Sequence, residues 1–392
     1  GVSMQALKAL AASFGDTVSG SDASTTGHDA KNVIGKDLVV YTNAVPYDNC
    51  ELIKARELNI PTVERASYLG AISRRYKTVV AVAGCHGKST ASAMLGAALS
   101  PVSPTVHVGA AGASAIGGTD IFITEACEYK RSFLSLLPSL GIVLNVGYDH
   151  PDCYRDKTEL IASYRDYARR CKTLLVNGDD DVCKTLAPHA VTFGLSRTCD
   201  YRAENIFEYD GKRSFTFRHG KTKIQVALNV VGAHNVKNAL AALSACDLLG
   251  YDTAAASKSL SAFRGIARRF EFLKHVYEKD VYCDYAHHPD EIRATVAAAK
   301  ELYPSVAVVF QPHTYSRTEA MLDGFAAALS MADTVALLPI FAAREKPTDV
   351  TSHTLYRRLR ALGVAAYLFE DGKSVAEFCK MLDEKALIFM GA

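Results

Sequence analysis

Residues 78–90 read TVVAVAGCHGKST. The first six form a continuous apolar run, which predicts a strand buried on both faces, as in a parallel sheet covered by helices. A glycine-rich turn follows, and the Ala- and Leu-rich residues after it predict a helix. In such a strand–loop–helix unit, the backbone N–H groups at the helix start bind phosphate. We therefore expect a nucleotide phosphate loop made of Gly84, Cys85, His86, Gly87, Lys88, Ser89 and Thr90.

The loop departs from the common G-x-x-x-x-G-K-[ST] pattern, because Val82 stands where the first glycine is expected. Lys88 can still reach the terminal phosphates of ATP, and the Ser89 hydroxyl can bind Mg²⁺. The alternative is a glycine-rich turn without a ligand. The position of the loop between a strand and a helix favours ATP binding over this alternative.

The composition is typical of a globular α/β protein of two to three domains. The chain has 392 residues, of which 49% are hydrophobic and 22% charged, and short apolar runs alternate with amphipathic stretches. Its 44 Lys and Arg against 42 Asp and Glu give a net charge of +2, which argues against a nucleic-acid-binding protein. No apolar run reaches about 18 residues, so no membrane insertion is expected. Ten cysteines without a C-x-x-C pair indicate reduced thiols and a cytoplasmic protein.

Three sections are predicted, over residues 1–76, 77–267 and 268–392. In the first, a strand is predicted to end with residues 18–22. Ser21 and Asp22 thus lie at a strand end, where a Rossmann-like unit binds a ribose; capping of a turn is the alternative. The first strand of this unit and most of its glycine loop are expected upstream of Gly1. A covering helix is expected after the last strand, beyond Ala392.

In the second section, Glu125 and His150 follow two predicted strands at 121–124 and 142–145. Because the carboxyl ends of parallel strands meet at the edge that carries the phosphate loop, both side chains are candidate Mg²⁺ ligands. Asn235 and Asn238 lie three residues apart on a predicted helix and share a face. Their amides can match the edge of adenine, with helix capping by Asn235 as the alternative.

The third section predicts a small open α/β sheet. Five strands are predicted, at 281–284, 306–310, 335–338, 365–369 and 387–390. The first two are followed by the polar stretches 284–289 and 311–317. His287, His288 and His313 could suggest zinc, but they lack the close spacing of a zinc motif. A pocket for anionic and amino groups is favoured, with Arg317 suited to a carboxylate or phosphate.

Seven motifs together resemble the Mur ligases, and most of all the alanine-adding branch of that family. They are residues 84–89, 125–129, 149–152, 234–240, 268–271, 284–289 and 310–317. The resemblance runs in order over essentially the whole chain, and its last two motifs are the most specific. It implies a three-domain α/β architecture: a Rossmann-like N-terminal domain for a UDP-sugar, a P-loop central domain for ATP, and a Rossmann-like C-terminal domain for an amino acid.

The resemblance also implies an activity and a set of site residues. ATP would drive the joining of L-alanine to the carboxylate of UDP-N-acetylmuramate, through an acyl phosphate, in peptidoglycan precursor synthesis. The resemblance implies Mg²⁺ binding by Ser89, Glu125 and His150, and nucleotide binding by Asn235, Asn238, Arg269 and Asp284. It implies UDP-sugar binding by Ser21 and Asp22. The alanine site would be lined by Tyr285, His287, His313 and Arg317. His287 or His313 would be the base. Lys88 would stabilise charge on the γ-phosphoryl group and, as a solvent-facing side chain, contribute little to the core.

The chain differs from the family pattern at several points. Cys85 and Ser89 replace threonines, and Tyr164 stands where some Mur ligases carry a carbamylated lysine. The stretch 108–118 is shorter than the family's substrate loop, so residues are expected to be missing there. Three alternatives remain open: a ligase that attaches a recycled peptide to the same UDP-sugar, a non-catalytic ATP-binding module, and a dinucleotide oxidoreductase, against which the lack of an intact G-x-G-x-x-G loop weighs.

Overall fold

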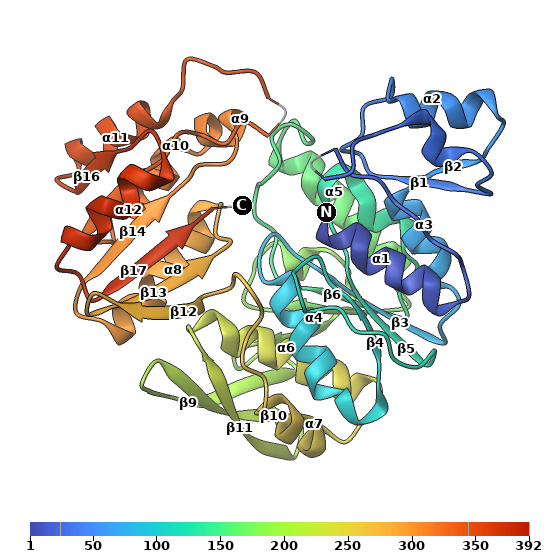
Figure 1. Cartoon of the computed structure of the whole chain (residues 1–392). Coiled ribbons are helices and arrows are strands. Elements are labelled where there is room, and N and C mark those ends of the chain that lie inside the picture. Colours follow the sequence, from blue (N-terminus) through green and yellow to red (C-terminus); the bar gives the residue numbers. More distant parts are fainter. Residues whose placement is uncertain (24, 344, 392) are drawn as a thin grey trace.

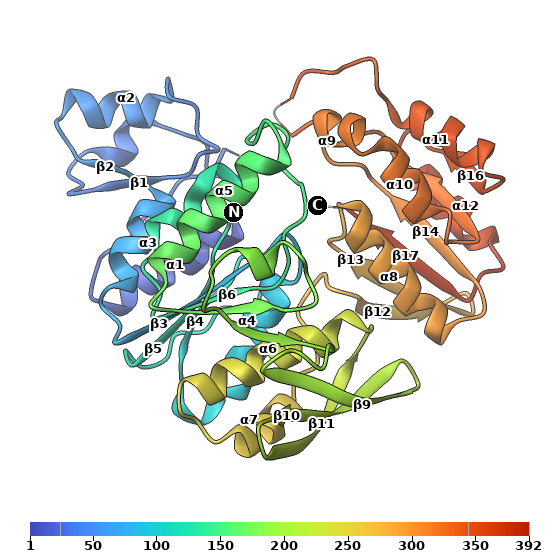
Figure 2. The same ribbon diagram turned by 180° about the vertical axis from the view of Figure 1, so that it is seen from behind.

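The chain forms three β-sheets, each covered by helices (Figure 1). The computed structural model describes residues 1–23, 25–343 and 345–391. The sheets occupy residues 39–64, 78–231 and 271–390, and each sheet therefore lies within one of the three predicted sections. The N-terminal and C-terminal parts lie on either side of the central part (Figures 1 and 2). The section boundaries near residues 76 and 267 stay a prediction.

The central sheet has nine strands in the order β11-β10-β9-β8-β7-β6-β3-β5-β4. The strands from β4 to β9 in this order pair in parallel. Strands β9, β10 and β11 form an antiparallel extension, in which β9 and β10 make a hairpin near residue 210. The strands are β3 (Thr78–Ala83), β4 (Thr105–His107), β5 (Ile121–Glu125), β6 (Leu140–Val143), β7 (Thr173–Asn177), β8 (Val191–Gly194), β9 (Tyr201–Tyr209), β10 (Lys212–His219) and β11 (Thr222–Val231).

Strand β3 lies in the middle of this sheet and contributes to cores on both faces. Val80 and Val82 pack with the helices α4, α6 and α7, while Val79 and Ala81 pack with α1, α3 and α5. This explains why the strand has no polar alternation. The helices are α1 (Val2–Ser13), α3 (Arg65–Ser73), α4 (Lys88–Ala98), α5 (Lys157–Arg170), α6 (His234–Leu248) and α7 (Thr253–Leu260), with the short 3-10 helices η2 (Ser100–Val102), η3 (Tyr129–Ser135) and η4 (Cys183–Thr185).

The N-terminal part is small. Its sheet consists of two parallel strands, β1 (Val39–Tyr41) and β2 (Thr62–Glu64), with α2 (Cys50–Glu57) and the 3-10 helix η1 (Ala30–Val33) beside them. The prediction of a strand that ends at residues 18–22 is wrong, because that segment is extended without a ladder and makes a bridge between Asp22 and Gly27. The Asp22 carbonyl instead accepts the N–H groups of Thr25, Thr26 and Gly27, so the backbone forms a turn in place of a ladder.

The C-terminal sheet has the order β12-β13-β17-β14-β15-β16 and is parallel except for β12 at its edge. The five expected strands are present, and β12 was not expected. The strands are β12 (Glu271–Val276), β13 (Lys279–Asp284), β14 (Val306–Phe310), β15 (Thr334–Leu337), β16 (Ala365–Leu368) and β17 (Ala386–Met390); the helices are α8 (Pro289–Leu302), α9 (Tyr315–Ala320), α10 (Leu322–Leu329), α11 (Ser352–Ala361) and α12 (Gly372–Met381).

The two large sheets are placed so that the carboxyl ends of their strands lie near each other. His288, at the start of α8 after β13, reaches the carbonyl of Tyr148, which follows β6. Within the described part of the chain, no helix has the length and apolar content needed to cross a membrane.

Candidate functional site

The phosphate loop joins β3 to α4 and depends on two glycines. Gly84 and Gly87 have φ of +145° and +83°, in the region that favours glycine. A side chain at Gly87 would place its Cβ 2.8 Å from the Asn238 amide oxygen. Asn145, which follows β6, holds the loop, since its Oδ1 accepts from the N–H of His86 at 2.9 Å and its Nδ2 donates to the His86 carbonyl at 3.0 Å. The loop backbone is thus held open to a ligand, which fits a nucleotide phosphate.

Contrary to our expectation, the Lys88 side chain does not face solvent. Its Nζ donates to both carboxylate oxygens of Glu128, at 3.0 and 2.9 Å, and to the carbonyls of Gly84 and Cys85. Glu128 is 2% exposed. Burial alone would raise the pKa of Glu128, but the nearby Lys88 and His150 hold it below the usual value. The pKa of Lys88 is raised because Glu128 outweighs the effect of its burial, so the loop carries a permanently charged ammonium group.

Glu125 ends β5 and His150 follows β6, and these two strands lie on either side of β3, which leads into the loop. His150 Nε2 is 3.7 Å from Glu128 Oε1, and Glu125 ends β5 and accepts the N–H of Gly109 at 3.3 Å. Ser89 is the second residue of α4. A hydroxyl and a carboxylate are the oxygen donors that Mg²⁺ prefers, and His150 adds a nitrogen donor. The donor set therefore fits Mg²⁺ beside nucleotide phosphates.

A cavity of about 730 Å³ extends from the phosphate loop to the C-terminal part. Among the residues that line it are Asn145, Asn235, Asn238, Arg269 and Asp284. Asn238 Nδ2 donates to Asn235 Oδ1 at 3.0 Å, and Asn235 Nδ2 donates to the Val231 carbonyl at 2.7 Å. Both asparagines lie inside α6, whose N-cap is Ala233, so the capping alternative for Asn235 is wrong. The pair presents amide groups to the cavity from one face of the helix.

Asp284 lies at the other side of this cavity, at the end of β13. Its carboxylate is buried and accepts the N–H groups of Phe270 and Ala286, both at 2.7 Å. Burial raises its pKa to about 6. A carboxyl group at this position can accept from a ribose hydroxyl.

Glu291, in the first turn of α8, was not identified from the sequence. Its carboxylate lies 3.4 Å from His86 Nδ1 and 3.3 Å from a guanidinium nitrogen of Arg269, and it accepts the N–H of His287 at 3.2 Å. An acidic residue in a first helical turn is ordinarily explained by the helix dipole. Only the packing of the two sheets shows that Glu291 links the phosphate loop to the C-terminal part.

His287, His313 and Arg317 gather at the ends of β13 and β14, and Arg317 also contacts the central part. Arg317 Nε donates to Asp149 Oδ1 at 2.9 Å, and Arg317 NH1 lies 3.1 Å from His313 Nδ1. Arg317 and Asp149 side chains are each 7% exposed. Burial would raise the pKa of Asp149, but His150 and Arg317 lower it far below the usual value. Asp149 belongs to the motif 149–152, for which the sequence predicted no role at this position. In the structure it is the acidic partner of Arg317.

The two histidines differ in their surroundings. His287 Nδ1 lies 2.9 Å from the Tyr285 carbonyl, which makes Nδ1 the donor and leaves Nε2 as an acceptor. Burial lowers the pKa of His287, and burial and Arg317 lower the pKa of His313 to about 4. Tyr285 packs edge-on against His287 with ring centroids 5.2 Å apart. The orientation of the His287 ring is therefore fixed by two neighbouring groups of Tyr285.

The remaining candidates lie elsewhere or in the core. Ser21 Oγ donates to Glu51 Oε2 at 2.7 Å, and Asp22 pairs with the amino group of Gly1 at 3.0 Å. Both residues therefore contact other residues of the N-terminal part. Tyr164 is fully buried and packs edge-on against Phe133. The stretch 108–118 forms a turn closed by a bridge between Val106 and Ala115. Whether residues are missing from that stretch stays a prediction.

Comparison with known proteins places three family models along the chain. Residues 1–77 match the Mur ligase family, catalytic domain; residues 82–246 match the Mur ligase middle domain; and residues 268–392 match the Mur ligase, glutamate ligase domain.

Among curated proteins, a UDP-N-acetylmuramate–L-alanine ligase of Alkaliphilus metalliredigens is 40% identical over 385 residues, covering 90% of this chain and 84% of the relative. Among solved structures, a UDP-N-acetylmuramate-alanine ligase from Thermotoga maritima is similar with a TM-score of 0.83 and 28% identity, covering 100% of this chain and 94% of the other. A murein peptide ligase from Psychrobacter arcticus has a TM-score of 0.74 at 22% identity, with coverage of 100% and 94%, and shows the fold alone.

Proposed function

The chain belongs to the Mur ligase family, and we propose that it joins L-alanine to the carboxylate of UDP-N-acetylmuramate while ATP is converted to ADP and phosphate. It is an ATP-dependent acid–amino-acid ligase of peptidoglycan precursor synthesis. The observation that carries this function is the junction at Arg317 and Asp149, which joins the phosphate-loop edge to the histidine cluster of the C-terminal part. An activated carboxylate formed at the first edge would thus lie next to an amine held at the second.

The reaction needs ATP because a carboxylate resists attack by an amine: it is anionic and lacks a good leaving group. In the proposed first step, the UDP-N-acetylmuramate carboxylate attacks the γ-phosphorus, giving an acyl phosphate and ADP. Lys88 stabilises the charge that moves onto the leaving phosphate oxygens. Glu128 keeps this ammonium group charged and oriented, because it holds Lys88 at 2.9 Å from beneath the loop. Mg²⁺ held by Ser89, Glu125 and His150 would neutralise charge on the phosphate oxygens.

In the proposed second step, the amine of L-alanine attacks the acyl carbon and phosphate leaves. The ammonium form must first lose a proton, and His287 Nε2 is placed to accept it because Nδ1 is engaged with the Tyr285 carbonyl. His313 is the weaker base, since its pKa of about 4 leaves little driving force for proton transfer near neutral pH. His313 and Arg317 would instead hold the carboxylate groups of the two substrates.

We assign the remaining ligand groups by position. Asn235 and Asn238 hold adenine, and Asp284 accepts from the ribose, because all three line the cavity that begins at the phosphate loop. Ser21 and Asp22 bind the UDP-sugar from the N-terminal part. We place the reaction in the cytoplasm, since all ten cysteines are free thiols.

One assay tests the reaction. The protein is incubated with ATP, Mg²⁺ and UDP-N-acetylmuramate, together with one member of an amino-acid panel, and released phosphate is measured. We expect L-alanine to give the highest kcat/KM, and we expect no phosphate release without the UDP-sugar. Equal ATP turnover with and without UDP-N-acetylmuramate would contradict the ligase reaction, and preference for a short peptide in the same panel would identify a peptide ligase.

A further inference from the structure

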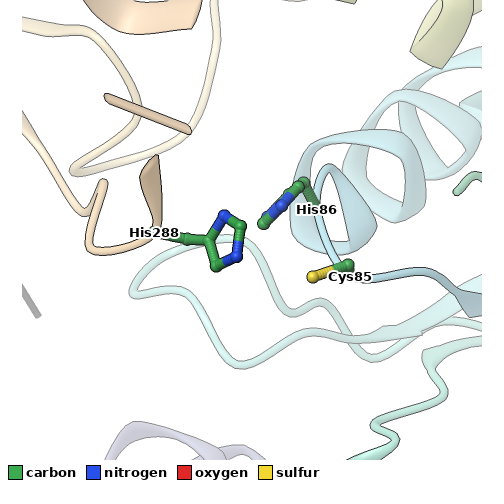
Figure 3. Close-up of side chains that lie close together, drawn as sticks. All are labelled: Cys85, His86 and His288. Carbon is green, nitrogen blue, oxygen red and sulfur yellow. The ribbon is translucent and has the colours of Figure 1, made fainter. Parts of the chain in front are cut away.

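Cys85, His86 and His288 form a side-chain cluster that the proposed reaction does not use (Figure 3). One sulfur or ring-nitrogen atom from each residue lies within 4.8 Å of the other two. Figure 3 shows that Cys85 and His86 come from the loop that begins α4, whereas His288 reaches them from the C-terminal part. The two imidazole rings have centroids 4.4 Å apart. Residues 200 positions apart thus meet at one point between the two large sheets.

The hydrogen bonds around His86 leave one nitrogen available. His86 Nδ1 faces the Glu291 carboxylate at 3.4 Å. His86 Nε2 is buried, and within the described residues it has no hydrogen-bond partner. A histidine whose one nitrogen faces a carboxylate while the other makes no hydrogen bond is the usual arrangement of a metal ligand. An unpartnered buried nitrogen is otherwise unfavourable, so a bound cation would satisfy it.

Asp290 adds a carboxylate at the rim of this cluster. Its Oδ2 lies 3.9 Å from His86 Nε2 and 3.7 Å from His288 Nδ1, while its Oδ1 accepts from Arg293 at 2.6 Å. The side chain of Asp290 is 55% exposed and free to adjust. It can complete a set of four ligands, or leave the fourth position to water.

The donor types select the cation. One sulfur and two imidazole nitrogens suit Zn²⁺ and other thiophilic divalent ions, whereas Mg²⁺ prefers oxygen ligands. Tetrahedral bonds of about 2.0–2.3 Å place ligand atoms roughly 3.3–3.8 Å apart, so side-chain shifts of about 1 Å complete the site. His288 Nε2 would then exchange its 3.3 Å contact with the Tyr148 carbonyl for the metal. Its proton would move to Nδ1, which gives up the Asp290 N–H and faces the Asp290 carboxylate at 3.7 Å.

We propose that Cys85, His86 and His288 form a binding site for one thiophilic divalent cation, with Zn²⁺ as the reference ion. Binding displaces the thiol proton of Cys85 and one proton of His86, whose pKa lies well above its usual value because Cys85 and Glu291 outweigh the effect of its burial. Both protons are released to solvent. The bound ion links the phosphate loop to the start of α8, and so holds the central and C-terminal parts together at the rim of the nucleotide cavity. The inference does not rest on the proposed ligase reaction, because the metal alone is the probe.

Cobalt spectroscopy tests the site directly. Co²⁺ is added to the full, metal-free chain, and we expect one equivalent to give tetrahedral d–d bands and a sulfur-to-cobalt charge-transfer band that Zn²⁺ abolishes. In Cys85→Ser the charge-transfer band should disappear, and the affinity for Zn²⁺ should fall at least about tenfold. His288→Asn should also weaken Zn²⁺ binding while keeping an acceptor for the Asp290 N–H at the helix start. Cys50→Ser, which removes an exposed thiol on α2, is the matched control and should bind as the unsubstituted chain does.

Thermal melting tests the link between the two parts. Zn²⁺ should raise the melting temperature of the unsubstituted chain and of Cys50→Ser, but not of Cys85→Ser or His288→Asn. A charge-transfer band that survives in Cys85→Ser, or is lost in Cys50→Ser, would overturn the site. Tight one-to-one binding without any rise in melting temperature would overturn the link.

Discussion

Buried charges with specific partners dominate the site at the scale of single residues. Lys88 with Glu128 and Arg317 with Asp149 are ion pairs in which each acidic partner is nearly inaccessible to solvent. Breaking such a pair leaves an uncompensated charge, which is far more destabilising than the loss of a surface pair. Substitutions at these positions therefore change stability as well as catalysis, and the two effects must be measured separately.

Lys88→Ala is expected to lower turnover by orders of magnitude and to lower the free energy of unfolding by about 3–5 kcal/mol, because Glu128 loses its partner. The double variant Lys88→Ala/Glu128→Gln should recover most of the stability, since the buried charge is gone, but none of the turnover. Urea unfolding and phosphate release measure the two effects. A single variant as stable as the double variant would show that the pair has no stabilising role.

Asp284→Asn is expected to change the pH dependence of stability. The pKa of Asp284 rises from its ordinary 3.8 to about 6 on folding, chiefly through burial, so the neutral form is favoured in the folded state. The contribution of Asp284 is greatest below pH 4 and is lost as the pH rises through 6. Relative to the unsubstituted chain, Asp284→Asn should gain on the order of 3 kcal/mol between pH 4 and pH 7.

The control for this experiment is Asp371→Asn. Asp371 is exposed at the start of α12, and its pKa is lowered by the hydrogen bond from the Ser374 N–H. The stability difference for this variant should change in the opposite direction with pH, and urea unfolding at both pH values checks both. A pH-independent difference for Asp284→Asn would contradict the raised pKa.

At the scale of elements, the phosphate loop and α6 pack so closely that backbone shape controls the nucleotide site. Gly87 is the N-cap of α4 and has φ of +83°, and a Cβ there would meet Asn238 on α6. The loop is also held by Asn145, which follows β6. The conformation of the loop at residues 84–87 thus depends on α6 and on the segment that follows β6.

Gly87→Ala is expected to destabilise the chain by about 1–2 kcal/mol, because an L-residue is strained at positive φ, and to weaken ATP binding as Asn238 is displaced. Gly372→Ala is the matched control: it lies in the first turn of α12, with nothing within 4 Å of its added Cβ. Thermal unfolding and ATP titration measure both variants. ATP binding that is equal in Gly87→Ala and Gly372→Ala would exclude the close contact.

At the scale of the whole molecule, the active arrangement depends on how the central and C-terminal parts dock. Asp149 with Arg317, His86 with Glu291, and the Tyr148 carbonyl with His288 connect the two parts. Each contact joins a strand end or loop of one sheet to a helix or strand end of the other. Polar contacts of this kind suit an interface that opens and closes around substrates.

Arg317→Ala is expected to reduce kcat/KM for UDP-N-acetylmuramate and L-alanine at least tenfold, with little change in ATP affinity, and to lower the melting temperature because Asp149 is left buried and unpaired. Arg358→Ala is the control, since its ion pair with Asp323 is largely exposed. Adding Asp149→Asn to Arg317→Ala should restore the melting temperature but not the activity. Restored activity in that double variant would limit Arg317 to a structural role.

Much of the fold follows from local pattern alone. The apolar run at residues 78–83 and the five C-terminal strands were correctly predicted, because a strand covered by helices needs continuous apolar residues wherever it lies. The strand expected at 18–22 and the missed edge strand β12 show the limit of this reasoning. Whether a half-polar segment becomes a strand depends on a neighbour to pair with, and the local sequence does not contain that information.

The phosphate-loop pattern, the α/β class and the motifs of the Mur ligase family could be predicted from local sequence, because glycine spacing, apolar runs and strand-end polar residues act over a few positions. The burial of Lys88 against Glu128, the contact of Glu291 with the loop and the pairing of Arg317 with Asp149 could not be predicted in this way. These contacts connect residues 40 to more than 200 positions apart. Their formation depends on how two separately folded sheets dock, and burial at that junction sets which charges are paired and how strongly they interact.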